Sequence, residues 1–398
     1  MKKVEERPRQ KSDQKKWILI GLFVALGALF VFRFPLFCNN LSRNIQSSII
    51  QLPALVPLEG GLKPNEKLTK AERVQEGVLV GPETIEFDKD GFFYTGLVNG
   101  QVVKVDSKNT SNIQLIAQMG SLGYQYCKSV REIPIKNCGR PLGLRLDKTG
   151  QNLYIADAYY GIFKINLQTK KLTSIVKADD VRFGNKPMKL VNDLDLDGDL
   201  IYFIDSSFLR HVDSAIEEHI EANPRGRLFS YNQKTNEMNL LLDGLYFPNG
   251  LQLSPQKDFL LINENSMAKI IKFYLVGEKK GKVELFAFIP GFGDTIRLTQ
   301  NKTLLVPFAS VRPSILDYLA EWPNLRNIMF KILNFKYLFK ILPKYGLLAE
   351  YGMDGVAIRS WHDPKGVKIE CTTAGAIYDN KLYLGSFYNS FLGIVNLN

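Results

Sequence analysis

The sequence is poor in the residues on which zinc enzymes and histidine-dependent hydrolases rely. It contains three histidines and four cysteines in 398 residues, with no CxxC pair and no cysteine–histidine spacing typical of a zinc site. No GxSxG motif is present, which disfavours a serine nucleophile on a strand-to-helix turn. His211 and His219 lie in a polar stretch of helical character and His362 in a predicted turn, so a histidine-based triad is not expected.

The chain also lacks a basic patch interleaved with aromatic residues, so we expect no nucleic-acid partner. The formal net charge is +11, and residues 1–16 alone hold seven Lys/Arg and three Asp/Glu. The remaining positive charge is spread along the sequence. With 45% hydrophobic and 11% aromatic residues, most of the chain is expected to fold.

One long apolar run decides the expected compartment. Residues 17–32 are all apolar, and after Arg33 the run continues to Cys38. Arg33 can extend to the interface, so the segment reaches the roughly 20 residues that span a bilayer core. Lys15 and Lys16 precede it and predict a cytoplasmic N-terminus. A cleaved signal peptide is the alternative, but bulky residues follow the run where a small-residue cleavage site would stand.

These features predict a single-pass type II membrane protein. Its expected parts are a cytoplasmic basic tail (1–16), a transmembrane signal-anchor (17–38), a connector (39–80) and a folded body (81–398). The body is expected on the lumenal or extracellular side, in the endoplasmic reticulum, the secretory pathway or at the plasma membrane.

The cysteines and sequons agree with an oxidising compartment. Cys127 and Cys138 bracket a polar loop and would close a small ring there. Cys38 and Cys371 are expected to stay unpaired. Two sequons in predicted exposed turns are expected to carry N-linked glycans, at Asn109 and Asn301.

A strand–turn–strand pattern recurs along the body. In Met188–Ser207 a short apolar strand, a carboxylate-rich turn and a run of β-forming residues follow one another. Comparable units begin near residues 84, 143, 193, 250, 296 and 374. Six units of this kind predict an all-β fold, a six-bladed β-propeller around a central channel. A β-sandwich would not explain why each unit starts in the same way.

Residues 312–346 interrupt the β pattern and predict a short helical insert. Pro313 and Pro323 suit helix starts, and apolar residues from Leu325 onward follow helical spacing. The insert holds six Lys/Arg against two Asp/Glu. Two interpretations stay open: a helical element packed across one propeller face, or a lid or second membrane contact that lays an amphipathic face on anionic lipid.

A polar residue stands just before the inner strand in four of the six units. Each alone suits an ordinary turn former, but their recurrence at matched places predicts one site in the channel. Two carboxylates and two amide carbonyls are the hard oxygen ligands that suit Ca²⁺ and not zinc. A calcium ion there would polarise an ester or lactone carbonyl. The four residues are Glu83, Asn192, Asn249 and Asp294, with Asp294 also the candidate general base.

Asp157 and Asp205 each follow a predicted strand. They are interpreted either as turn or channel-lining carboxylates, or as contacts to a substrate in the channel. Sequence alone leaves both interpretations open.

Several segments together resemble the strictosidine synthase-like family, most closely its animal branch. They are GPETIEFD, CGRPLGLRLD, VNDLDL, FPNGLQLSP, PGFGDTIRLT and LYLGSFYNSFLG. The resemblance implies a six-bladed propeller, a type II anchor and a Cys127–Cys138 bridge. The wider superfamily includes paraoxonases and calcium-dependent gluconolactonases, whose central calcium is held by a Glu, Asn, Asn, Asp set. That set matches Glu83, Asn192, Asn249 and Asp294.

One departure from the family bears on activity. Plant synthases carry a glutamate before the last inner hairpin, where this chain has Thr373, so the condensation of an amine with an aldehyde is not expected. The sequence therefore predicts a calcium-dependent hydrolase of esters or lactones, of arylesterase type. The alternative is a non-catalytic surface glycoprotein or receptor-like binding module with a structural calcium.

Overall fold

The computed structural model describes residues 44–128, 135–183, 185–332 and 344–397. Within these ranges no helix is long and apolar enough to cross a membrane. The predicted basic tail and signal-anchor, residues 1–38, lie outside the described residues. The transmembrane helix therefore stays a prediction. One compact unit, residues 47–323 and 343–398, contains the whole β structure.

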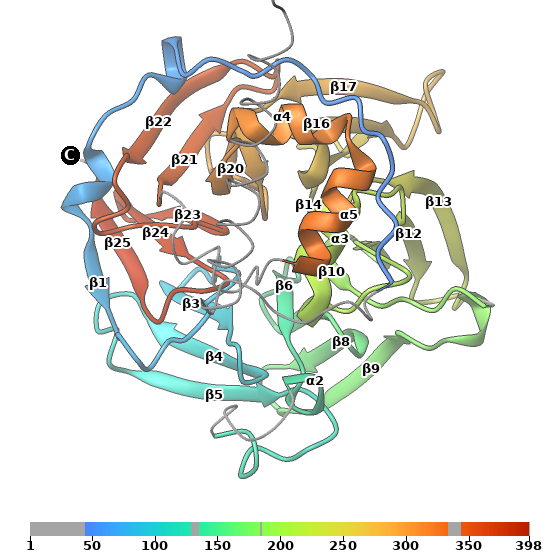
Figure 1. Cartoon of the computed structure of the whole chain (residues 1–398). Helices are drawn as coiled ribbons and strands as arrows, with labels where there is room; N and C mark the ends of the chain where they lie inside the picture. The colour runs from blue at the N-terminus through green and yellow to red at the C-terminus, as the bar shows by residue number, and fades with distance from the viewer. Residues whose placement is uncertain (1–43, 129–134, 184, 333–343, 398) are drawn as a thin grey trace, which may run out of the picture. The chain divides into compact units, whose positions relative to one another are not determined.

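Six antiparallel sheets are arranged around a central axis as a six-bladed β-propeller, as predicted (Figure 1). The first blade comprises β2 (Glu86–Phe87), β3 (Phe92–Gly96), β4 (Gln101–Asp106) and β5 (Ile113–Gln118). The second comprises β6 (Pro141–Leu146), β7 (Asn152–Asp157), β8 (Gly161–Asn166) and β9 (Leu172–Lys177). The third comprises β10 (Val191–Asp197), β11 (Leu200–Asp205), β12 (Gly226–Asn232) and β13 (Met238–Leu245).

The remaining blades follow the same order from the axis outward. The fourth comprises β14 (Pro248–Leu253), β15 (Phe259–Glu264), β16 (Lys269–Tyr274) and β17 (Val283–Phe288). The fifth comprises β18 (Gly291–Gly293), β19 (Arg297–Leu298), β20 (Leu304–Val311), β21 (Gly346–Tyr351) and β22 (Ala357–Asp363). The last comprises β23 (Ala374–Tyr378), β24 (Lys381–Gly385) and β25 (Leu392–Asn396).

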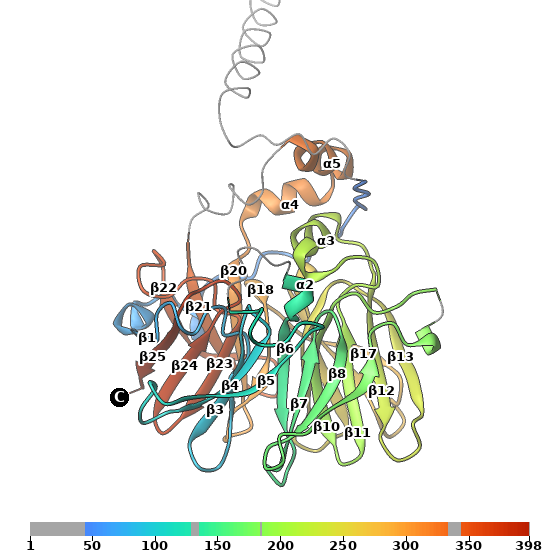
Figure 2. The same cartoon turned by 90° about the horizontal axis from the view of Figure 1, so that it is seen from below.

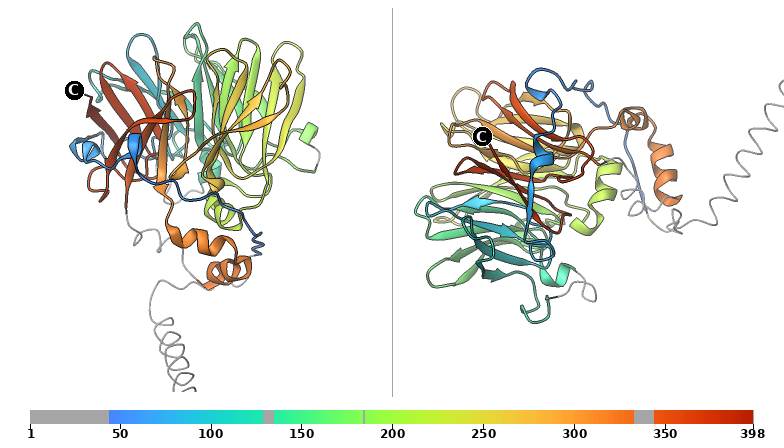
Figure 3. Two further views of the ribbon diagram at one scale, coloured as in Figure 1. Left: turned by 90° about the horizontal axis from the view of Figure 1, so that it is seen from above. Right: turned by 90° about the vertical axis from the view of Figure 1, so that its left-hand side faces the viewer.

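A strand from the predicted connector completes the last blade. β1 (Glu72–Val74) pairs antiparallel with β25, so the first and last strands of the described residues lie side by side (Figures 1 and 3). The connector 39–80 is thus partly a propeller element. This pairing closes the ring of blades, since hydrogen bonds join the two ends of the β structure.

Helices occur only in connections of the described chain. The short ones are η1 (Gly60–Leu62), η2 (Lys67–Lys70), α2 (Ile135–Cys138), η3 (Val181–Phe183), η4 (Val212–Ser214), α3 (Ala215–Glu221) and η5 (Asn265–Met267). In the described part of the predicted insert, the structure has two helices between β20 and β21, α4 (Ser314–Ala320) and α5 (Pro323–Ile332). Residues 333–343 of the insert lie outside the described residues. Pro313 caps α4 and Pro323 begins α5, as the sequence predicts.

Apolar side chains fill the wedges between neighbouring blades. Between the third and fourth blades, for example, Ile204 and Leu228 pack against Leu251 and Ile262, all fully buried. Burying a side chain of this size contributes about 1.5–3 kcal/mol. The strands carry β-branched and aromatic residues because these fit a pleated, half-buried surface. The wedges fix each inner strand against its neighbour and so fix the walls of the channel.

Inner strands begin with a local irregularity. The register of β10 against β11 shifts between Val191 and Leu194, and that of β14 against β15 between Pro248 and Leu251. A β-bulge of this kind bends a strand and redirects the side chain at the bulge. The residues at these two bulges include Asn192 and Asn249.

Candidate metal centre in the propeller channel

The four predicted ligands occupy matched positions at the starts of inner strands. Asn192 and Asn249 lie at the bulges of β10 and β14. Glu83 donates its backbone N–H to Gly96 of β3, and Asp294 donates its own to Pro307 of β20. All four residues are buried. The inner strands of four of the six blades therefore each bring one oxygen-bearing side chain to the same end of the channel.

Glu83 and Asp294 come from different blades and lie close enough to interact electrostatically. Burial raises the pKa of Glu83 to about 7, while Arg140 and a hydrogen bond from Thr373 lower it. Burial, and then the charge of Glu83, raise the pKa of Asp294 well above its usual value. Ionising both carboxylates would therefore concentrate negative charge in a site that excludes water.

The two amides complete the set. Asn192 donates through Nδ2 to the Ser206 hydroxyl (3.0 Å), which donates to the carbonyl of Pro248 (2.6 Å). This link ties Asn192 to the strand that carries Asn249. The Oδ1 atom of Asn249 is buried and has no hydrogen-bond partner among the described residues. A buried acceptor without a donor costs about 1–3 kcal/mol, which a cation at this position would offset.

The backbone brings Asn249 next to Asp294. A Cβ atom on Gly250 would overlap the carbonyl oxygen of Asp294 and the amide nitrogen of Ile296. Only glycine permits this close approach. Asn263 also donates to the Asp294 carbonyl, at 3.1 Å. The fourth and fifth blades are therefore in direct contact where they supply their ligands.

The donor set fits a hard cation. Two carboxylates, an unpartnered amide oxygen and a second amide are ligands that Ca²⁺ takes readily, with water completing the shell. Across the residues that the structure describes, no group of three or more His, Cys, Asp or Glu side chains could hold a metal ion. The candidate set has only two acidic members, so its two amides are essential to it.

Arg140 supplies the nearest positive charge. Its guanidinium is fully buried, with Nη2 3.5 Å from Glu83 Oε2 and the group 4.5 Å from the ring centre of Phe387. Nη1 donates to the carbonyl of Gly81 at 3.0 Å. Thr373 donates to Glu83 Oε2 at 3.2 Å. Arg140 and Thr373 thus hold one oxygen of Glu83.

Cys371 and Tyr388 lie near the same carboxylates. Burial, and then the charge of Asp294, raise the pKa of the Cys371 thiol. Burial likewise raises the pKa of Tyr388, with smaller contributions from Cys371 and Glu83. Both groups therefore stay protonated in the ordinary pH range. Cys371 is the free cysteine of the described chain.

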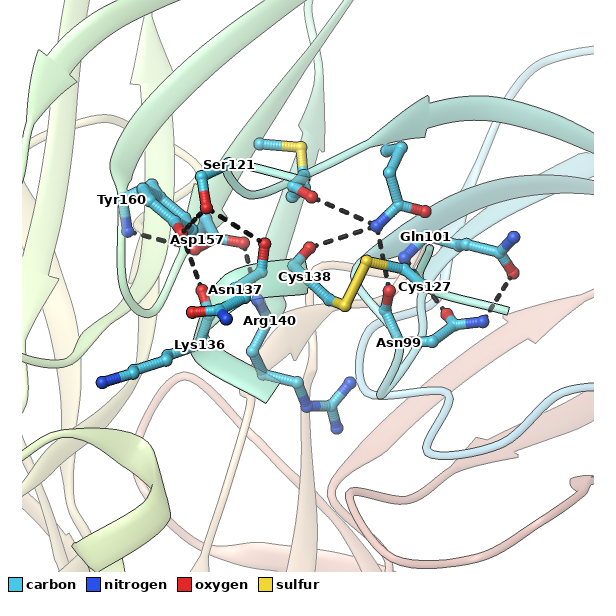
Figure 4. The surroundings of a disulfide bond; sticks show 12 residues. Asn99, Gln101, Ser121, Cys127, Lys136, Asn137, Cys138, Arg140, Asp157 and Tyr160 are labelled. Carbon is cyan, nitrogen blue, oxygen red and sulfur yellow. Dashed lines mark hydrogen bonds between the residues drawn. A yellow bond between two sulfur atoms is a disulfide. The ribbon is translucent and has the colours of Figure 1, made fainter. Parts of the chain in front are cut away.

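Asp157 and Asp205 close turns after the second strands of their blades. Asp157 accepts backbone N–H groups of Arg140 (2.8 Å), Tyr159 (3.0 Å) and Tyr160 (3.1 Å) (Figure 4). Asp205 accepts from Leu190 (3.0 Å) and from Arg227 Nη2 (2.5 Å). Burial raises the pKa of each to about 6. Both carboxylates thus close turns, and contact of either with a substrate stays a prediction.

A second layer of charged and amide side chains stands three residues after each of the four site positions, and Arg145 has the matching place in the second blade. Arg297 binds Asp193 through both terminal nitrogens, at 2.7 and 2.9 Å. Arg145 donates to Asp195 at 3.3 Å, and Gln252 donates to the same carboxylate at 2.8 Å. The sequence analysis missed this layer. The available signal was the repeated spacing of a charged or amide residue three positions on, at Glu86, Arg145, Asp195, Gln252 and Arg297.

The histidines are not members of this set. His362 lies within β22 and not in a turn as predicted, and it is fully buried. Its ring nitrogens contact Tyr345 Oη and Ser360 Oγ, both at 2.8 Å. His219 lies on α3, where its ring packs 4.1 Å from that of Phe247. Burial lowers the pKa of His219 to about 4, so it stays neutral.

The predicted disulfide is confirmed. Cys127 and Cys138 are bonded, with their Cα atoms 5.7 Å apart (Figure 4). Gln118 donates to the Cys138 carbonyl at 3.1 Å, which fixes the ring to the edge of the first blade. The sequon residues Asn109 and Asn301 are both exposed in turns, as their predicted modification requires.

Comparison with known sequences agrees with this architecture. Residues 192–278 match the strictosidine synthase family model, and residues 60–105 match the model of the strictosidine synthase-like N-terminal region. The chain is 39% identical over 342 residues to human adipocyte plasma membrane-associated protein, covering 84% of this chain and 80% of that protein. The zebrafish (Danio rerio) protein of that name is 36% identical over 361 residues, covering 89% and 84%. Drosophila melanogaster hemomucin is 35% identical over 304 residues, covering 72% and 50%.

Solved structures share the fold at low sequence identity. A gluconolactonase from Xanthomonas campestris superposes with a TM-score of 0.54 at 13% identity, covering 82% of this chain and 90% of that one. The calcium-binding protein regucalcin from Agrobacterium tumefaciens gives 0.52 at 12% identity, covering 81% and 92%. With this propeller and these relatives, the chain belongs to the strictosidine synthase-like family, in the branch of adipocyte plasma membrane-associated protein.

Proposed function

We propose that this protein is a calcium-dependent hydrolase of esters or lactones, with the metal in the central channel. The observation that carries the proposal is the buried pair Glu83 and Asp294, whose like charges repel each other, together with the buried, unpartnered Oδ1 of Asn249 on the neighbouring blade. Such a site is destabilising when its carboxylates are ionised, and a divalent cation would neutralise it. The fold that it shares with gluconolactonases and regucalcin supports the same interpretation.

Each residue has a defined part in this proposal. Glu83, Asn192, Asn249 and Asp294 would hold the ion, which when bound polarises the carbonyl of the substrate. Arg140 and Thr373 orient Glu83 through its Oε2 atom. Thr295 donates its N–H to Asp294 Oδ1 at 2.9 Å. We assign Oδ2 of Asp294 to taking a proton from the attacking water, with the surrounding burial excluding other water.

The test is turnover of phenyl acetate and of lactones by the full chain, with calcium and with a chelator. We expect hydrolysis that is lost with chelator and in Asp294→Ala. Asp90→Ala is the matched control, because Asp90 is an exposed carboxylate in the β2–β3 turn. Hydrolysis that persists in chelator, or equally in Asp294→Ala, would contradict the proposal.

A second candidate is a non-catalytic binding module with a structural calcium. The names of the curated relatives favour it, since they describe association with the adipocyte plasma membrane and not an activity. It predicts no turnover of any ester or lactone, together with a higher melting temperature in calcium. The condensation of an amine with an aldehyde is not proposed, because Thr373 stands at the start of the last inner hairpin and donates to Glu83.

We also propose a type II topology, with residues 17–38 as the anchor and the body lumenal or extracellular. The apolar run, the Cys127–Cys138 bond and the names of the relatives support it. Glycosidase treatment of the protein from a secretory host should increase its electrophoretic mobility. The shift should be smaller by one glycan in Asn109→Gln, and likewise in Asn301→Gln. A chain without glycans at either site would count against a lumenal body.

A further inference from the structure

α4 presents an apolar face to solvent. Ile315, Tyr318 and Trp322 are 57%, 60% and 51% exposed, and their spacing places them on one side of the helix and the turn that follows it. The opposite side is buried through Leu319 and Ala320. An apolar stripe on the outer side of a helix is unusual for a soluble surface and marks a contact site.

The helix is fixed firmly to the propeller. Ala320 packs with Ile50, Ala222 and Met267 in one buried cluster. Arg312, just before the helix, is bonded to Asp317 at 3.0 Å and to the carbonyl of Pro53 at 2.6 Å. Apolar contacts and an ion pair therefore hold the helix in place, so that its exposed apolar stripe has a fixed orientation on the propeller.

The N-terminal segment arrives beside this helix. Ile50 donates its N–H to the carbonyl of Ala320, and Ser48 donates to that of Glu221 at the end of α3, both at 3.2 Å. Ile49, between them, is 66% exposed. We define the α4 surface as Ile315, Tyr318 and Trp322.

Two features of the chain indicate what covers the α4 surface. The apolar run 17–32 precedes this segment, and at most about 40 Å of extended chain joins Phe32 to Asn44. This short link leaves the α4 surface within reach of a bilayer that held the run. Tyr318 and Trp322 are stacked, with ring centres 6.1 Å apart, and these two residue types are the ones enriched at membrane–water interfaces.

We propose that the α4 surface docks onto the surface of a lipid bilayer. Residues 312–346 hold six Lys/Arg against two Asp/Glu, but residues 312–322 hold only one of the six and both acidic residues. Attraction to anionic headgroups would therefore come from the basic residues that follow α4 in the sequence. α5, described by itself, also exposes apolar residues of its predicted stripe, Leu325 and Ile328.

The docked orientation has a consequence for the channel. α3 follows β11 and α4 follows β20, and the ends of these strands pair with the starts of β10 and β18. Figure 2 shows α3 and α4 at the same end of the propeller. The end of the channel where Asn192 and Asp294 lie would thus face the lipid, within reach of amphiphilic molecules in the interface.

The experiment uses the three tryptophans of the full chain, Trp17, Trp322 and Trp361. Three variants each keep one of them and replace the other two by Phe. They are studied in vesicles of phosphatidylcholine and phosphatidylserine that carry bromine atoms near the top of the acyl chains. Trp17 reports the predicted anchor, Trp322 the α4 surface, and Trp361, which is 3% exposed in the propeller core, is the matched control.

We expect bromine to quench the Trp322 emission to about half or less, because interfacial side chains sit roughly 5–10 Å into the headgroup boundary, and to leave Trp361 unchanged. Quenched Trp17 with unquenched Trp322 would show an anchored protein whose α4 surface stays in water, and would overturn the proposal. A blue-shifted but unquenched Trp322 would show that protein covers the surface, which overturns it equally. Should Trp361→Phe fail to fold, the difference between Trp17→Phe and Trp17→Phe/Trp322→Phe isolates the same signal.

Discussion

Stability of the metal-free protein should fall as pH rises through the titration of Glu83. Its pKa is about 7 in the folded protein against an ordinary value of 4.5. Between these values the folded state binds more protons than the unfolded state, so raising the pH favours unfolding. The shift corresponds to about 3 kcal/mol of lost unfolding free energy by pH 7 and above. Asp294, whose pKa is raised too, adds a loss of the same sign.

Calcium should remove this loss, because a bound cation favours the ionised carboxylates that protons otherwise neutralise. The assay is the unfolding midpoint of the full chain from about pH 5 to pH 8, with chelator and with calcium. Glu83→Gln cannot ionise, so it should flatten the pH dependence in chelator and gain little from calcium. Asp157 and Asp205 have raised pKa values as well, so the informative quantity is the difference between wild type and Glu83→Gln.

Two results would refute this reasoning. One is an identical pH dependence in chelator for wild type and Glu83→Gln, which would mean that the carboxylate is not buried beside a like charge. The other is a calcium effect that is equal in both proteins, which would place the ion elsewhere. Asp90→Asn, at an exposed turn, should behave as wild type throughout.

Three further predictions follow from packing. Arg297→Met leaves the carboxylate of Asp193 buried without its partner and should cost about 3–5 kcal/mol in chemical denaturation; a loss below about 1 kcal/mol would show the pair to be solvated. Gly250→Ala forces a Cβ onto the backbone at Asp294 and should cost about 1–3 kcal/mol while weakening calcium binding; unchanged calorimetric affinity would contradict the close approach. Cys127→Ser opens the ring at the first blade and should lower the free energy of unfolding by about 2–4 kcal/mol. The variant should then be as stable as the wild type under reducing conditions, and a difference between them would contradict this account.

The sequence predicts the repeating part of the fold well, because the pattern that identifies each blade lies within a short stretch of sequence. Strand, turn and strand lie within one short window, as in β10 and β11, and glycine or asparagine marks the hairpin. The pairing of β1 with β25 could not be predicted in this way. A three-residue strand has little periodicity, and its partner is far along the chain.

The candidate site, too, has a part that the sequence predicts and a part that it does not. The sequence predicts Glu83, Asn192, Asn249 and Asp294 as a candidate set because each stands at a recognisable boundary between a loop and a strand. The second charged layer was missed because Arg297 and its equivalents look like ordinary polar strand residues until the blades are assembled. His362 was misplaced since Trp-His-Asp-Pro suggests a turn, whereas pairing with β21 extends β22 through Asp363.

Calcium binding to the full chain, measured by isothermal titration calorimetry, tests the central claim most directly. The account predicts one ion per chain, lost in Glu83→Gln and in Asp294→Asn and retained in Asp90→Asn. No binding by the wild type, or binding that survives both channel substitutions, would contradict a metal centre in the propeller channel.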